Sequence, residues 1–155
     1  MRRKDREIKD FARMTEILKS CGCCRLGLVD AGGAYIVPMN FGCEIQGDTV
    51  FLYFHSAKEG RKMNLLWSQP SVTFEADCGH ELLAADIACG FSYRYRCVMG
   101  KGTVEILAQA DDKIYGLQKI MEHYSGAKDH TFDFRMLDRI YVLRLTVTEW
   151  SCKEH

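Results

Sequence analysis

Residues 53–62 read Tyr-Phe-His-Ser-Ala-Lys-Glu-Gly-Arg-Lys and join a stretch of strand character to a stretch of helical character. Ser56 and Glu59 have the S-x-x-E spacing of a capping box, which predicts that a helix begins just after Ser56. The unpaired N–H groups and positive dipole end of a helix start attract phosphate, and His55 can donate a hydrogen bond or a proton. Three cations follow within two turns: Lys58, Arg61 and Lys62. The stretch suits a monophosphate, but a surface helix with solvated cations fits the same spacing.

Segments rich in β-branched and aromatic residues lie on both sides of this junction. Strands are predicted at 25–29, 34–41, 49–54, 71–76, 93–107 and 141–148. Pro38 indicates an edge strand or a bulge, because proline cannot donate a ladder hydrogen bond. Helices are predicted from 11 to about 21, at 57–67 and at 112–124, and loops at 78–90 and 125–133. Asp111 is the expected N-cap of the last helix, and Gly126 follows its end. Few, short helices favour a mainly β fold, an antiparallel β-barrel, over alternating βαβ units.

The composition is that of an ordinary globular domain, with 47% hydrophobic and 27% charged residues among 155. We therefore expect one domain across 1–155, with 1–10 as a flexible arm because its basic and acidic residues are interleaved. Acidic and basic residues balance at 21 each, which gives no electrostatic reason to expect nucleic acid or a membrane as partner. A charged start without a long apolar run predicts a cytoplasmic protein. Its eight cysteines are then expected to be reduced.

The run at 53–62 resembles a signature of the FMN-binding split-barrel proteins. More narrowly, it is similar to the nitroimidazole-resistance (Nim) branch, which is related to pyridoxamine 5′-phosphate oxidase. Further matches follow the family's order: the strand beside the flavin at 35–41, the start of the next strand at 69–74, and a later strand at 92–102. The ordered set covers most of the chain and implies the FMN-binding split-barrel fold.

The resemblance implies a homodimer with FMN bound at the subunit interface. Ser56 and Lys62 would hold the phosphate, residues 38–41 would line the isoalloxazine, and His55 would act as the catalytic proton donor. The full set implied in cofactor binding is Pro38, Met39, Asn40, Phe41, His55, Ser56, Ala57, Lys62, Arg94 and Arg96. Cys97 stands where the family usually has serine. The tail at 149–153 also departs from the family pattern, so the role of Trp150 stays open.

A bound flavin supplies hydride or electron transfer, while the protein supplies orientation and electrostatics. The resemblance thus implies an FMN-dependent oxidoreductase that reduces a small organic acceptor, such as a nitroaromatic or a quinone-like molecule. NAD(P)H or a partner protein is the expected electron donor. The chain lacks a Gly-x-Gly-x-x-Gly motif, so no Rossmann-type dinucleotide domain is expected. Two alternatives stay open: a barrel that holds haem or a deazaflavin, and a flavin-binding module without turnover.

Residues 21–24 read Cys-Gly-Cys-Cys and contain a C-x-x-C spacing. They follow a helix and enter a strand, which is the reverse of the thioredoxin-like context. Cys78, His80 and Cys89 match no standard zinc spacing, so no metal site is expected. Buried or incidental free thiols are the favoured interpretation of the cysteines, with a metal or redox role as the alternative. The remaining histidines are interpreted as structural or exposed: His80, His123 and His130.

Overall fold

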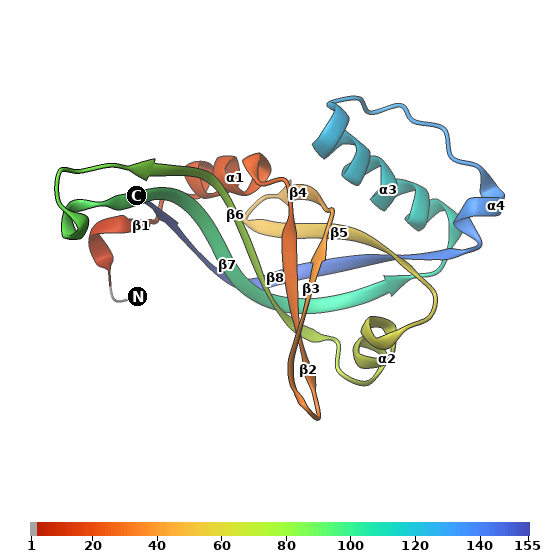
Figure 1. Ribbon diagram of the computed structural model, residues 1–155. Coiled ribbons are helices and arrows are strands. Elements are labelled where there is room, and N and C mark those ends of the chain that lie inside the picture. Colours follow the sequence, from red (N-terminus) through yellow and green to blue (C-terminus); the bar gives the residue numbers. More distant parts are fainter. Residues whose placement is uncertain (1–2) are drawn as a thin grey trace.

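The computed structural model describes residues 3–155, which form one antiparallel sheet with a few helices packed against it (Figure 1). The strands are β1 (Glu7–Ile8), β2 (Cys24–Asp30), β3 (Gly33–Met39), β4 (Gly42–Gln46), β5 (Thr49–Ala57), β6 (Ser71–Leu83), β7 (Ser92–Leu107) and β8 (Ile140–Glu154). The helices are α1 (Phe11–Ser20), α2 (Arg61–Ser68), α3 (Ala110–Ser125) and α4 (Phe134–Leu137), with 3-10 turns at Lys4–Arg6 and Ala88–Gly90. The strand order is β3-β2-β6-β7-β8-β5-β4, with β1 added to β8. The predicted mainly β, antiparallel fold is confirmed.

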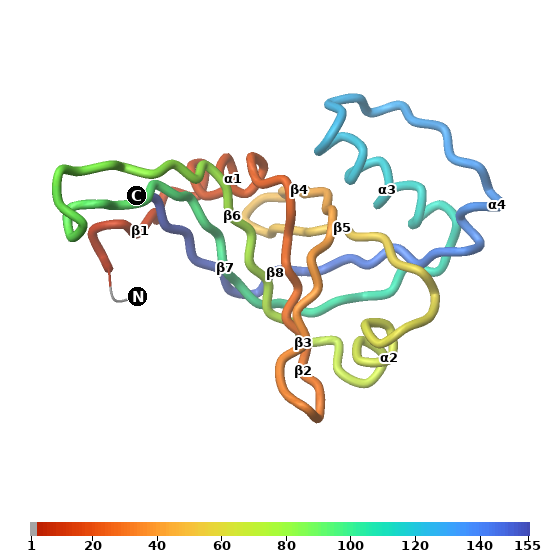
Figure 2. The backbone as a smooth tube through the Cα atoms, viewed as in Figure 1, coloured from red at the N-terminus to blue at the C-terminus, as the bar shows by residue number. Residues whose placement is uncertain are grey.

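Two long strands, β7 and β8, run side by side through the molecule and curve together (Figure 2). Their register shifts between Lys101 and Gly102. A Cβ atom on Gly102 would overlap the carbonyl oxygen of Thr146 on β8, so only glycine permits this close approach. Such an irregularity bends a strand pair and increases its twist. The bend lets the sheet curl around the core.

The core lies mainly between the curled sheet and α1. Met14, Ile17 and Leu18 face inward from α1, as their helical spacing predicts. Each such side chain contributes roughly 2 kcal/mol when it leaves water. The Asp10 side chain caps the helix by accepting from the Arg13 N–H at 2.8 Å.

A second, smaller core holds α3 against β4 and β5. Tyr53 and Ile120 are buried there. The Glu44 carboxylate accepts from the Tyr53 hydroxyl at 2.8 Å, from Tyr115, and from the Lys119 ammonium at 2.9 Å. This largely covered carboxylate has three donors, two of them on α3, so it holds α3 against the sheet.

Several predicted boundaries are corrected. The loop predicted at 78–90 is wrong for residues 78–83, because β6 pairs with β7 as far as Leu83. The last strand continues through the supposed tail to Glu154 for the same reason, since β7 offers partners along its whole length. The N-cap of α3 is Gln109, not Asp111, whereas Gly126 takes the predicted left-handed conformation after the last turn. β4 and α4 were not predicted.

The arm predicted at 1–10 is also corrected in part. Glu7 and Ile8 pair with Lys153 and Cys152, so β1 is part of the sheet. Residues 1–2 lie outside the described part of the chain. Pro38, by contrast, lies in β3 at one end of the strand order, as an edge strand requires.

Candidate functional site

The junction between β5 and α2 differs from the predicted capping box. Ser56 pairs with Tyr141 and Ala57 with Ile140, so the strand continues past the predicted helix start. The Ser56 hydroxyl is buried and donates to the carbonyl of Ala57 at 2.9 Å. Helix α2 begins only at Arg61, with Gly60 as N-cap at a φ of 112° and no side-chain cap. The prediction that Ser56 caps this helix is wrong, because pairing with β8 keeps it extended.

The first turn of α2 contains two cations and no acidic residue. Arg61 is paired: its Nε donates to the Asp30 carboxylate at 2.7 Å, and its guanidinium lies 4.5 Å from the Tyr35 ring centroid. Arg61 lowers the pKa of Asp30 below its ordinary value, mainly through this hydrogen bond. Arg61 therefore ties α2 to the hairpin of β2 and β3.

Lys62 is the second cation. Its ammonium lies 3.7 Å from the thioether sulfur of Met39, and burial lowers its pKa. Within residues 3–155, no carboxylate forms an ion pair with it. A cation in the first turn also faces the positive end of the helix dipole, and the N–H groups there lack acceptors within the helix. This half-buried positive charge is unbalanced.

Further basic side chains lie around the same strand end. Partial burial, and secondly the charge of Lys62, lower the pKa of His55, so its ring is mostly neutral at pH 7. The Lys58 and Lys113 ammonium groups lie 5.4 and 5.7 Å from the ring centroid of Tyr141, the strand partner of Ser56. Lys113 is buried and donates to the carbonyl of Leu137. The end of β5 is therefore a cationic region that suits an anion.

Residues 38–41, at the end of β3 and just before β4, alternate between exposed and buried side chains. Pro38 and Asn40 are exposed, whereas Met39 and Phe41 are buried. The Phe41 ring packs 4.4 Å from that of His123. Only Pro38 and Asn40 therefore present their side chains outward beside the cationic region.

Arg94 and Arg96 lie elsewhere in the chain. Arg96 pairs with Glu154 at one end of β8, while Ser56 pairs with Tyr141 near the other end. At about 3.3 Å per residue, the strand separates these positions by about 40 Å. Figure 1 shows the β6–β7 hairpin far from α2. One subunit therefore does not bring the two arginines to Lys62, and Arg94 instead pairs with Glu81 at 2.9 Å.

Sequence reasoning missed a hollow of about 570 Å³ on the sheet. Its lining includes Ile36, Met99, Gly100 and Trp150, and Ile36 and Met99 are 63% and 41% exposed. Neither His55 nor Lys62 lines it. Strand alternation is the signal that could have found it, because Ile36 and Met99 are apolar residues on the outward positions of their strands.

The other candidates are accounted for locally. All eight cysteines are free thiols, and the described residues contain no group of three or more metal-ligating side chains. His80 faces Asp77 at 2.9 Å, His123 contacts the carbonyl of Cys21 at 2.8 Å, and His130 contacts Ser125 at 3.0 Å. In residues 3–155 we find no helix with the length and apolar character that a membrane span needs.

Comparison with known proteins gives a consistent result. A family model described as pyridoxamine 5′-phosphate oxidase matches residues 10–154. The chain is similar to a protein provisionally described as a 5-nitroimidazole antibiotic resistance protein from Bacteroides thetaiotaomicron, with 30% identity, a TM-score of 0.81, and 96% of this chain and 86% of that chain covered. It is also similar to the flavocytochrome Anf3 from Azotobacter vinelandii, with 21% identity, a TM-score of 0.80, and coverage of 100% and 72%. A third similar structure is the FAD and haem binding protein from Mycobacterium smegmatis, with 20% identity, a TM-score of 0.79, and coverage of 96% and 73%. No curated protein matches the sequence.

The last two similarities establish the fold, which is the split barrel that the sequence predicts. The family match spans nearly all of the described chain, and the Bacteroides protein supports it at higher identity. This chain belongs to the pyridoxamine 5′-phosphate oxidase-like family, whose members generally bind a flavin.

Proposed function

We propose that this protein binds FMN with the phosphate at the β5–α2 junction and reduces small organic acceptors such as nitroaromatics. The observation that carries the proposal is the half-buried ammonium of Lys62, whose one hydrogen-bond partner among the described residues is the sulfur of Met39. A phosphate would supply the missing negative charge. It would also satisfy the free N–H groups of the first turn of α2.

The residues present fit such a group. Lys62 and the first-turn amides would hold the phosphate. The Ser56 hydroxyl donates to the Ala57 carbonyl, so it would have to turn from that carbonyl to donate to the phosphate. Pro38 and Asn40 present exposed side chains on the neighbouring edge, where the ring system would lie. FMN rather than FAD is favoured, because a terminal monophosphate matches a single unbalanced ammonium.

The flavin would supply the hydride or electron transfer. His55 would then hold a proton close to the acceptor. Its lowered pKa leaves the ring neutral at pH 7, so it would donate a hydrogen bond there and a full proton more readily as pH falls. The nitroaromatic acceptor class is supported by the description of the Bacteroides relative, and NAD(P)H or a partner protein would supply electrons.

We further propose that the protein acts as a homodimer with the flavin at the interface. The hollow lined by Ile36, Met99 and Trp150 is an apolar surface on the sheet, of the kind that a second copy buries. A two-fold partner would also allow Arg94 and Arg96 of the other copy to approach a site that they do not reach within one chain.

The first test is the visible spectrum of the freshly purified protein, followed by mass identification of what heat denaturation releases. We expect flavin bands, release of FMN, and NAD(P)H-dependent bleaching that an added nitroaromatic reverses. Release of haem, or failure to take up added FMN, would refute the cofactor assignment. Tight FMN binding without any turnover would refute the reductase activity alone. Sedimentation of the FMN complex as a monomer would refute the dimer.

A further inference from the structure

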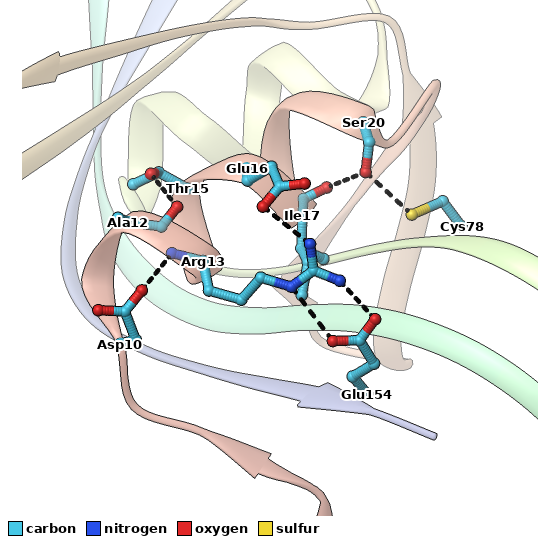
Figure 3. Close-up of polar contacts among 9 residues, drawn as sticks. All are labelled: Asp10, Ala12, Arg13, Thr15, Glu16, Ile17, Ser20, Cys78 and Glu154. Atoms are coloured by element: carbon cyan, nitrogen blue, oxygen red, sulfur yellow. Dashed lines mark hydrogen bonds and ion pairs between the residues drawn. The ribbon is translucent and has the colours of Figure 1, made fainter.

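Two thiols meet at the C-terminal end of α1, on elements that do not belong to the junction site. The Cys21 sulfur contacts the carbonyl oxygen of Ile17 at 3.3 Å. The Ser20 hydroxyl donates to the same carbonyl at 2.8 Å and lies 3.3 Å from the sulfur of Cys78 on β6. Figure 3 shows Ile17, Ser20 and Cys78 in this arrangement. One hydroxyl and one carbonyl therefore connect the two thiols.

The two thiols differ in access to solvent. Cys21 is only 1% exposed, whereas Cys78 is half-buried. Burial raises the pKa of Cys21, and the nearby Cys78 adds to the increase, which is a second sign that the sulfurs are close. Cys24, the other end of the C-x-x-C spacing, is influenced by Cys23 instead. The natural partner of Cys21 is thus Cys78.

We propose that Cys21 and Cys78 form a reversible disulfide when the protein meets hydrogen peroxide. The thiolate of Cys78 attacks the O–O bond, which releases hydroxide and leaves a sulfenic acid on Cys78. The Cys21 sulfur then attacks that sulfur, so that the S–S bond forms, the S–O bond breaks and water leaves. In total, two thiols are oxidised, one peroxide is reduced, and a disulfide and two waters result. A dithiol reductant reverses the reaction.

The consequence is a covalent link between α1 and β6. In the reduced protein, packing and the contact between Ser20 and Cys78 hold these two elements together at this point. Closing the loop between residues 21 and 78 restricts the unfolded chain and raises the melting temperature of the oxidised form. This property does not depend on the proposed flavin site.

The test is peptide mapping of the full-length protein after brief peroxide treatment and alkylation of the remaining thiols. Trypsin cleaves after lysine and arginine, so Cys21 is released in peptide 20–25 and Cys78 in peptide 63–94. We expect these two peptides to be joined, with a mass about 2 Da below their sum because two hydrogens are lost. Dithiothreitol should separate them.

Each peptide contains its own control, since Cys23 lies in the first and Cys89 in the second. The variants Cys23→Ser and Cys89→Ser should keep the joined peptides, whereas Cys78→Ser should abolish them. Fragmentation of the joined wild-type peptides assigns the bond without any variant, should Cys78→Ser fail to fold. A bond assigned to Cys23, Cys24 or Cys89, a link confined to residues 21–24, or oxidation of Cys78 without a joined peptide would overturn the proposal.

Discussion

The two ends of β8 differ in how their charges are matched. At the far end, the Glu154 carboxylate accepts two hydrogen bonds from Arg13, at 2.5 and 3.2 Å, and Arg13 also pairs with Glu16 (Figure 3). At the near end, beside Ser56, the ammonium of Lys62 has the Met39 sulfur as its one hydrogen-bond partner among the described residues, and no ion-pair partner there. Matched charges hold α1 in place, whereas the unmatched charge is the one that we propose to bind a phosphate. The first arrangement stabilises the fold, and the second is the basis of the proposed site.

The largest expected effect is the loss of stability from a substitution at the bend of β7 and β8, between the two ends of β8. The variant Gly102→Ala should destabilise the protein by about 3 kcal/mol, because its methyl group overlaps the carbonyl of Thr146 and forces β7 and β8 apart. Urea unfolding measures this loss. Gly32→Ala is the matched control, since a Cβ atom there meets nothing within 4 Å. Equal stability of the two variants would show that the close crossing does not maintain the bend.

The variant Lys62→Met removes the unpaired positive charge beside Ser56 and keeps the aliphatic stem of the side chain. We expect FMN affinity to fall about 10- to 100-fold, the range of one charged hydrogen bond. The free energy of unfolding without ligand should stay the same or rise, because an unpaired half-buried cation is lost. Calorimetric titration with FMN measures the first effect.

The control for that titration is Lys128→Met, which removes an exposed lysine paired with Glu122. It should bind FMN as the wild type does. An unchanged affinity in Lys62→Met would remove this residue from the phosphate site.

The variant Arg13→Met removes the ion pair between Arg13 and Glu154 at the other end of β8. Both partners of the Arg13–Glu154 pair are one-third exposed, so we expect a loss of about 1 kcal/mol and a decrease in Tm of about 3 °C. FMN affinity should not change. Arg135→Met, at a side chain that is 90% exposed, should alter neither quantity. A loss of FMN affinity in Arg13→Met would contradict the separation of the two ends.

The smallest effect is on the titration of His55. Lys62 and burial lower the pKa of this ring in the free protein, and an added phosphate dianion should raise it by favouring the charged form. Binding of FMN should therefore be accompanied by proton uptake as pH falls towards the pKa. Histidine NMR signals measured with and without FMN check the direction, with His80 on the β6–β7 hairpin as the reference, which Figure 1 shows far from α2. A further decrease in the His55 pKa would place the phosphate elsewhere.

The strands could be predicted from the sequence because the alternation of apolar and polar residues is a local pattern. Leu143 and Leu145 are buried and Arg144 and Thr146 are not, as alternation predicts. The helix start was misjudged because the S-x-x-E spacing is also local, whereas Ser56 is held in β5 by Tyr141, far along the chain. Long-range pairing overrides a capping signal in this case, and it also extends β6 and β8 beyond their predicted ends.

For the same reason, only part of the candidate site could be predicted from the sequence. Lys62 and His55 lie close together, as the motif at 53–62 suggests, and Met39 joins them from the separate match at 35–41. The pairing of Arg61 with Asp30 depends on how the β2–β3 hairpin folds back, which no local motif encodes. The apolar hollow likewise draws on Ile36, Met99 and Trp150 from three separate strands. Sequence reasoning finds chemistry that lies within one motif and misses surfaces assembled from several strands.

The position of β8 has a consequence for how the protein is made. It is the last strand along the chain, yet it lies between β7 and β5 in the sheet. Until it emerges from the ribosome, β3-β2-β6-β7 and β5-β4 are two separate sheets, and the end of β5 lacks its partner Tyr141. Such non-local pairing is slow to form and leaves strand edges open in the meantime. The β5–α2 junction of the nascent chain therefore takes its final form only after β8 has been made, long after residues 53–62 have been translated.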